Sequence, residues 1–363
     1  MTGRRLAILP VALAACTLHA GAMAQESTPP PDVVNLATVL RLARDASPRL
    51  AIERQAIAGA EANRISAGSY PNPTLNYGRF RPHGGQATLF EGSRQEQASF
   101  DLPLLIGGQR SARIEKADLE IEAARARVAS GSSSLAAEAG AAYVALLAAQ
   151  EKTVLLSGAN EELARLRNIV SGRAASGVAS RYDLTRLDVE LGGSRAKLED
   201  AKADVSDRAG NLAALLGLPN WRPRAAGDLK PMALDIGTLA KARDRVATSP
   251  ASIAAVSEET AAQSGIEMAR RERMPVPSIS LGRSWTSEPF GAANFLGLSV
   301  EIPLFDTRRG QLARAEADAI SATLRRELAH AEVAANLERL ANVITGRQAA
   351  LQRFERDAAS QLP

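Results

Sequence analysis

Residues 98–128 read ASFDLPLLIGGQRSARIEKADLEIEAARARV, residues 171–180 read SGRAASGVAS, and residues 212–219 read LAALLGLP. Between these segments, apolar and small residues recur at spacings of three and four, as on a helix that packs along one face. The pattern predicts a strand, a tight turn at Gly107 and Gly108, a helix of about 60 residues, a reversal and a return helix. At 1.5 Å per residue the first helix spans roughly 90 Å, which is more than a compact domain needs.

The two long helices carry a heptad pattern, which predicts that they supercoil on partner helices. The repeating positions are Ile114, Ala117, Ile121, Ala124, Val128, Gly131 and Leu135 in the first helix, and Leu184, Leu187, Leu191, Ser194, Leu198, Ala201, Val205, Arg208, Leu212 and Leu215 in the second. Gly172 and Gly177 are expected to end the first helix, and Ser180 with Asp183 to cap the second. Gly217 is expected to end the return helix. Taken alone, these helices also fit a plain coiled-coil hairpin.

The first 24 residues have the features of a secretory signal. Arg4 and Arg5 precede an apolar stretch from Leu6 to Leu18, and small residues follow before Gln25. Cleavage after residue 24 would leave a mature chain without cysteine, since Cys16 is the only one. An alternative is open, because residues 13–16 (Leu-Ala-Ala-Cys) resemble a lipoprotein processing box that would leave Cys16 as a lipidated N-terminus.

Composition argues against several classes of function. The formal net charge is +4, and the two leader arginines contribute to it, so the remainder is only slightly basic and does not suggest a nucleic-acid partner. His19, His83 and His330 have no cysteine or histidine at ligand spacing. Gly107-Gly108 is not followed by the Lys-Ser/Thr of a phosphate loop. We therefore expect neither an enzyme nor a resident cofactor or metal.

Two segments alternate polar and apolar residues in the way that strands do. Residues 74–80 form the first, and residues 95–102 form the second, with Gln97, Ser99 and Asp101 on one face and Ala98, Phe100 and Leu102 on the other. The longest apolar run after the leader has about 11 residues, so no membrane-spanning helix is expected. Membrane entry would therefore require strands that close into a barrel.

The same order of segments recurs about 200 residues later, which predicts an internal repeat. Residues 247–250 resemble 45–48, residues 274–277 resemble 70–73, residues 301–304 resemble 101–104, and residues 310–318 resemble 108–116. Two further alternating segments, 278–285 and 296–302, follow in register. The predicted organisation is a signal peptide (1–24), a flexible lead-in (25–35), a first copy (36–217), a connector (218–235) and an incomplete second copy (236–363).

This order of elements resembles the TolC-like outer membrane efflux protein family. The residues that carry the resemblance are Pro71-Asn72-Pro73, the run from Leu102 to Arg110, the long hairpin, and residues 215–219 before the second copy. Residues 70–74 and 102–113 are most similar to the cation-efflux, CzcC-like branch. The resemblance implies a mainly α fold with antiparallel coiled-coil hairpins, in which two β-hairpins per chain enter a shared, trimeric, twelve-stranded barrel. It also implies a periplasmic helical part, a homotrimer, an adaptor (membrane fusion) protein, an inner-membrane pump, contact with outer membrane lipid, and passive export of heavy-metal cations.

The resemblance implies roles for two sets of residues. The tip of the helical hairpin, where the adaptor docks in the family, corresponds to Gly177, Val178, Ala179, Ser180, Tyr182 and Asp183. The same residues also fit a simple helix stop and cap. Barrel aromatics facing lipid or its interface correspond to Phe80, Phe100, Trp285 and Phe295.

Two expectations qualify this interpretation. A periplasmic coiled-coil adaptor or scaffold without a pore is the alternative, although two lipid-length strand pairs related by a repeat disfavour it. The repeat spacing also predicts that the second return helix is absent and would need about 55 more residues. From the sequence we therefore expect that the chain as given does not make a working efflux channel.

Overall fold

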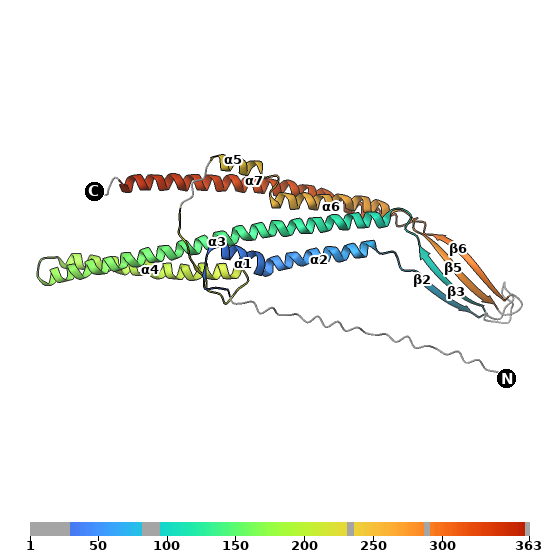
Figure 1. Ribbon diagram of the computed structural model, residues 1–363, viewed down its shortest axis with the longest axis horizontal. Helices are drawn as coiled ribbons and strands as arrows, with labels where there is room; N and C mark the ends of the chain where they lie inside the picture. The colour runs from blue at the N-terminus through green and yellow to red at the C-terminus, as the bar shows by residue number, and fades with distance from the viewer. Residues whose placement is uncertain (1–29, 82–94, 231–235, 287–290, 360–363) are drawn as a thin grey trace, which may run out of the picture.

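The computed structural model describes residues 30–81, 95–230, 236–286 and 291–359. The predicted signal peptide (1–24) and Cys16 lie outside the described residues. The molecule is elongated, with long helices side by side along most of its length and a small sheet at one end (Figure 1). The turn between the two hairpin helices lies at the opposite end (Figure 1).

The helices of the first copy are α1 (Leu36–Ala46), α2 (Pro48–Gly68), α3 (Gln109–Ala175) and α4 (Arg181–Leu215). Those of the second are α5 (Ile236–Asp244), α6 (Pro250–Glu272) and α7 (Arg309–Ala359). The predicted seam is buried or half-buried throughout α3 and α4 except at Arg208, where the neighbouring Ala209 takes the buried position. Arg208 is exposed because its long charged side chain remains in water and pairs with Asp204 at 3.1 Å.

α2 and α4 both pack on α3 and follow one another along it, with α2 on the sheet side and α4 on the tip side (Figure 1). Gly217, with φ +73°, ends α4 as predicted. A Cβ atom on Gly217 would lie 2.6 Å from the Pro48 ring at the start of α2. The end of one helix therefore abuts the beginning of the other, although about 170 residues of chain separate them.

The largest group of buried side chains surrounds this junction. It contains Val34, Val39, Ala43, Leu50, Leu135, Ala139, Tyr143, Leu146, Leu147, Ala209, Leu212, Ala213, Leu216, Trp221 and Ala225. The predicted flexible lead-in and connector take part in it: β1 (Val33–Val34) pairs in parallel with β4 (Arg224–Ala225). The Trp221 indole N–H donates to the Pro31 carbonyl at 3.1 Å. The described part of the lead-in is thus held against the bundle rather than flexible.

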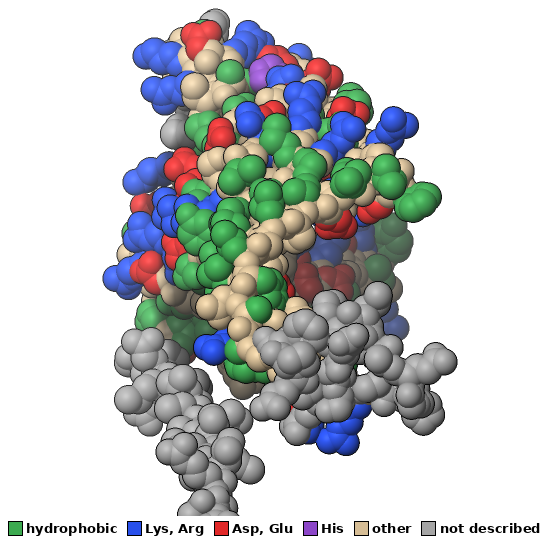
Figure 2. Space-filling view, turned by 90° about the vertical axis from the view of Figure 1, so that its right-hand side faces the viewer, with side chains coloured by type: hydrophobic (Ala, Val, Ile, Leu, Met, Phe, Trp, Pro, Cys, Tyr) green, Lys and Arg blue, Asp and Glu red, His purple; other side chains and the backbone are tan. Residues whose placement is uncertain are grey.

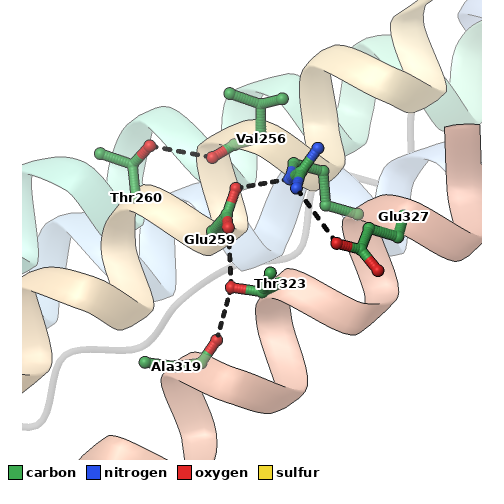
Figure 3. Close-up of polar contacts among 7 residues, drawn as sticks. Val256, Glu259, Thr260, Ala319, Thr323 and Glu327 are labelled. Atoms are coloured by element: carbon green, nitrogen blue, oxygen red, sulfur yellow. Dashed lines mark hydrogen bonds and ion pairs between the residues drawn. The ribbon is translucent and has the colours of Figure 1, made fainter.

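α6 lies between α3 and α7 and is tied to both by successive glutamates. Glu258 pairs with Arg127 of α3 at 2.9 Å. Glu259 pairs with Arg326 of α7 at 2.8 Å and accepts from the Thr323 hydroxyl at 2.7 Å (Figure 3). On the surface, Arg243 of α5 donates to both carboxylate oxygens of Glu338, which lowers the pKa of that carboxyl.

The sheet at the end of the molecule is antiparallel, with strand order β2-β3-β5-β6. The strands are β2 (Thr74–Phe80), β3 (Gln95–Pro103), β5 (Pro277–Thr286) and β6 (Ala292–Val300). β6 begins earlier than predicted because its first residue pairs with Trp285, and Ile302 lies beyond its end. β2 and β6 are the edges, and within the described residues neither has a partner on its outer side.

One helix is long and apolar. Among the described residues, α3 could cross a membrane by length and composition alone, although polar side chains interrupt its apolar residues. That the chain has no membrane-spanning helix stays a prediction. α3 packs along α2, α4 and α6, so its apolar surface belongs to the helical bundle.

Candidate functional site

The strand register separates the sheet into two chemically different faces. Paired residues in antiparallel strands point to the same side, and successive residues alternate. One face, here called the apolar face, carries Leu75, Tyr77, Phe100, Leu102, Ile279, Leu281, Trp285, Leu296, Leu298 and Val300. The opposite, polar face carries Thr74, Asn76, Gln95, Gln97, Ser99, Asp101, Ser278, Ser280, Ser284, Thr286 and Ser299. The predicted alternation is confirmed on all four strands.

The apolar face is uncovered in the isolated chain. Leu75, Leu296 and Leu298 are 76%, 75% and 72% exposed. Hydrophobic side chains stand along one side of the sheet when the molecule is viewed from this end (Figure 2). An apolar surface of this extent on a soluble protein marks contact with another protein or with a membrane.

The four predicted aromatic residues do not share one face. Phe100 and Trp285 lie on the apolar face, but Phe80 and Phe295 lie on the polar face. Each of the latter covers a glycine: the Phe295 ring lies where a Cβ on Gly282 would be, at 2.2 Å, and the Phe80 ring lies 3.3 Å from the equivalent point on Gly78. The four residues therefore do not form one set on a single face, because the glycines make room for two rings on the opposite side. Which of them face lipid or its interface stays a prediction.

Charges appear on the apolar face only toward the end farthest from the helices. Arg79 and Glu96 are cross-strand partners, with an ion pair of 3.3 Å. The Arg283 guanidinium lies 5.7 Å from the centre of the Trp285 ring. An aromatic ring beside a long cationic side chain is typical of the level at which a bilayer meets water. The apolar face therefore has a hydrophobic band near the helices and an amphipathic rim beyond it.

The hairpin tip brings the predicted tip residues together in one compact turn. α3 passes through Gly172 and ends at Ala175, so Gly172 is not the helix stop; Gly177, with φ +75°, is. The amides of Gly177 and Val178 donate to the carbonyls of Ala174 and Arg173 at 3.1 and 2.8 Å, which closes the helix end.

The second helix of the tip begins immediately after this turn. The Ser180 hydroxyl accepts from the Tyr182 amide at 3.1 Å, and Asp183 lies in the first turn of α4, where negative charge is favourable. Val178 and Tyr182 are 77% and 72% exposed. The turn thus presents two apolar side chains to solvent on a fixed backbone.

Comparison with known proteins shows which protein family this chain is similar to. The profile of the outer membrane efflux proteins matches residues 39–218. The chain is 27% identical over 286 residues to the cobalt-zinc-cadmium resistance protein CzcC of Cupriavidus metallidurans, an overlap that covers 77% of this chain and 65% of that protein. It is 28% identical over 322 residues to the nickel-cobalt-cadmium resistance protein NccC of Alcaligenes xylosoxydans xylosoxydans, covering 85% of this chain and 69% of that one. The chain belongs to the outer membrane efflux protein family.

The fold of this outer membrane efflux protein is shared with solved channels. The outer-membrane channel OprN aligns with a TM-score of 0.68 at 22% identity, covering 90% of this chain and 77% of that one. The predicted fold class, long helical hairpins with a small antiparallel sheet, is confirmed, and so is the resemblance to the cation-efflux branch.

Sequence reasoning missed one polar residue inside the helical hairpin of this family member. Asn160 of α3 is 8% exposed, and its amide nitrogen donates to the Leu156 carbonyl of its own helix and the Ser194 carbonyl of α4, each at 3.1 Å. Its side-chain oxygen is buried without a hydrogen-bond partner. The signal was an asparagine on the inner face of an otherwise apolar and small-residue helix, which can pin the register of paired helices.

The described residues contain no group of three or more His, Cys, Asp or Glu side chains that could hold a metal ion. His330 is an exposed residue of α7, and His83 falls outside the described residues. The two-faced sheet and the hairpin tip are therefore the features on which a function can be argued.

Proposed function

We propose that this protein is a subunit of an outer membrane channel, a passive conduit for heavy-metal cations in a tripartite efflux pump. Three chains would share one twelve-stranded barrel in the outer membrane, with their helices in the periplasm. The observation that carries the proposal is the sheet, which has one apolar face, one polar face and two unpaired edges. A channel subunit of this kind needs no catalytic residue.

The sheet's edges argue for a shared barrel. Backbone groups at an open edge cannot face lipid, so β2 and β6 must pair with other strands in a membrane. Two chains would contribute eight strands in all, and an eight-stranded barrel is filled by its own side chains. Three chains contribute twelve strands, and the polar face would then line a lumen. A pore-free adaptor or scaffold has no use for such a sheet.

The cargo and partners rest on the relatives. CzcC and NccC are named for resistance to cobalt, zinc and cadmium and to nickel, cobalt and cadmium, respectively. Because a conduit need not chelate what it passes, the sparse metal ligands among the described residues are compatible with such a cargo. An adaptor protein that docks on the hairpin tip and an inner-membrane pump complete the proposed assembly.

The experiment that tests the proposal is cell fractionation of the full chain expressed in a Gram-negative host. We expect the protein in the outer membrane fraction, migrating as a trimer in mild detergent and unfolding to a monomer on boiling. Alkaline washing should not extract it, because strands inside the bilayer are held by the hydrophobic band. Recovery from the soluble periplasmic fraction would instead favour the scaffold interpretation.

The hairpin tip provides a separate prediction about the adaptor. Val178→Glu is expected to reduce crosslinking to the adaptor by at least about tenfold, because it places a charge on the exposed apolar surface of the turn. Val154→Glu is the matched control, since Val154 is 66% exposed on α3 but lies away from the tip. Equal crosslinking in both variants would show that the tip is only a turn. Circular dichroism should be the same for both proteins.

A further inference from the structure

The polar face of the sheet carries charge of only one sign. Within the four described strands, the charged residues are Arg79, Glu96, Arg283 and Asp101, and the first three lie on the apolar face. Asp101 of β3 is therefore the one charged side chain of the polar face in these strands. The other polar-face side chains are uncharged: serine, threonine, asparagine and glutamine, together with Pro103, Ala293 and the two phenylalanines over glycines.

The Asp101 carboxylate is held in place without being neutralised. The Asn76 side-chain amide of the neighbouring strand β2 donates to one of its oxygens. This neutral donor fixes the carboxylate on the polar face and leaves its charge intact. Among the described residues, no lysine or arginine lies within ion-pair distance of Asp101, whereas Glu96 on the other face is paired with Arg79.

The internal repeat supplies a second carboxylate at the equivalent place. Glu301 directly follows β6, and its position in the alternation assigns it to the side of Ser299, the polar face. The equivalence is visible in the backbone: Gly108, seven residues after Asp101, and Arg308, seven residues after Glu301, both have positive φ (+74° and +53°) and directly precede α3 and α7.

Unlike Asp101, Glu301 has positively charged side chains nearby. Arg273 and Arg308 line the same shallow depression as Glu301. Both guanidinium groups are engaged with backbone carbonyls, Arg273 with Thr307 at 3.2 Å and Arg308 with Glu272 at 2.5 Å. Asp101 is therefore the carboxylate with less positive charge near it, and Glu301 adds a second negative charge that two arginines partly offset.

We infer that Asp101, assisted by Glu301, gives the pore a preference for cations over anions. The inference rests on the proposed function, because the polar face lines a lumen only in the closed barrel. Three subunits would then place three aspartates and three glutamates around the helix-proximal end of the barrel. Rings of acidic side chains favour cation passage because they raise the local cation concentration and repel anions.

Ionic strength decides how large the preference is. The screening length is about 10 Å at 0.1 M salt and about 3 Å at 1 M, whereas a twelve-stranded lumen is wider than either. At low salt the field of the carboxylates therefore reaches well into the lumen from its wall, whereas at high salt it is confined to the wall. We expect cation preference at low ionic strength and its near loss at 1 M.

The test is ion selectivity of the full-chain protein in planar bilayers. With a potassium chloride gradient centred near 0.1 M, the reversal potential should give a potassium-to-chloride permeability ratio above about 2. Asp101→Asn should lower this ratio at least about twofold, Glu301→Gln should lower it less, and Asp101→Lys should make the pore anion-preferring. Glu96→Gln, on the opposite face of the same strand, is the matched control and should leave the ratio unchanged.

The outcomes separate this inference from the proposed function. If no conductance appears, either from the chain as given or from one extended by about 55 residues to supply the second return helix, the channel proposal itself fails. If channels conduct but the Asp101→Asn and Asp101→Lys variants have the wild-type ratio, the channel proposal stands and the assignment of selectivity to Asp101 is overturned. Equal conductance of wild type and Asp101→Asn at 1 M salt is expected and shows that the substitution has not altered the pore itself.

Discussion

Leu298→Arg is expected to remove most of the protein from the outer membrane. Leu298 is 72% exposed on the apolar face of β6, between Leu296 and Val300. An arginine that faces lipid near the middle of a bilayer costs about 2–4 kcal/mol, and the trimer would incur that cost three times. The measurement is the amount of boiling-sensitive trimer in the outer membrane fraction.

Ser299→Arg is the matched control for this prediction. Ser299 is the next residue of the same strand, is also exposed, and points to the polar face. An arginine there would lie in the water-filled lumen, so assembly should be nearly normal. If the two variants assemble equally well, or if Ser299→Arg is the more damaging, the assignment of faces to lipid and lumen is wrong.

Gly217→Ala is expected to destabilise the helical bundle strongly. Gly217 has φ +73°, a conformation that costs an alanine about 1–2 kcal/mol. The new Cβ would also lie 2.6 Å from two atoms of the Pro48 ring, and such overpacking typically costs about 1–3 kcal/mol. We expect a loss of about 2–4 kcal/mol in the free energy of unfolding, measured by denaturant titration in detergent.

Gly192→Ala tests the same substitution where neither cause applies. Gly192 lies inside α4, and nothing would approach its Cβ within 4 Å. Alanine in a helix interior is favoured over glycine by about 0.5–1 kcal/mol, so this variant should be slightly more stable than the wild type. Destabilisation of similar size in both variants would mean that the contact at Pro48 is not what makes Gly217 necessary.

The sequence pattern predicted those strands, helices and turns whose causes lie in residues close together along the chain. The strands followed from alternation, and the long hairpin followed from the heptad seam with Gly177 and Ser180 at its turn. The repeat was visible because each copy needs the same sequence of helix starts and strand pairs. Gly172 was misassigned as a helix stop because a glycine in a long packed helix costs only about 1 kcal/mol, which the surrounding turns of α3 offset.

Features that depend on contacts between distant segments were not predictable. The β1–β4 pair joins residues about 190 positions apart, and two residues per strand are too few to show alternation. The contact of Gly217 with Pro48 also needs the fold before it has meaning. The faces of Phe80 and Phe295 follow from strand parity, because each ring lies on the same side of the sheet as the glycine two residues away or across the strand pair, Gly78 and Gly282.

The junction between α4 and α2 determines how mechanical force travels along the first copy. α3 runs without a break from the sheet to the tip, whereas the layer beside it consists of two rods that meet end on at Gly217 and Pro48. A compressive load on the tip is shared by both layers, because the rods press against each other. A tensile load separates α2 from α4, so that α3 alone bears it. A pull from a docked partner would therefore bend the first copy near Gly217 and Pro48, with the gap between α2 and α4 opening and the molecule curving toward α3.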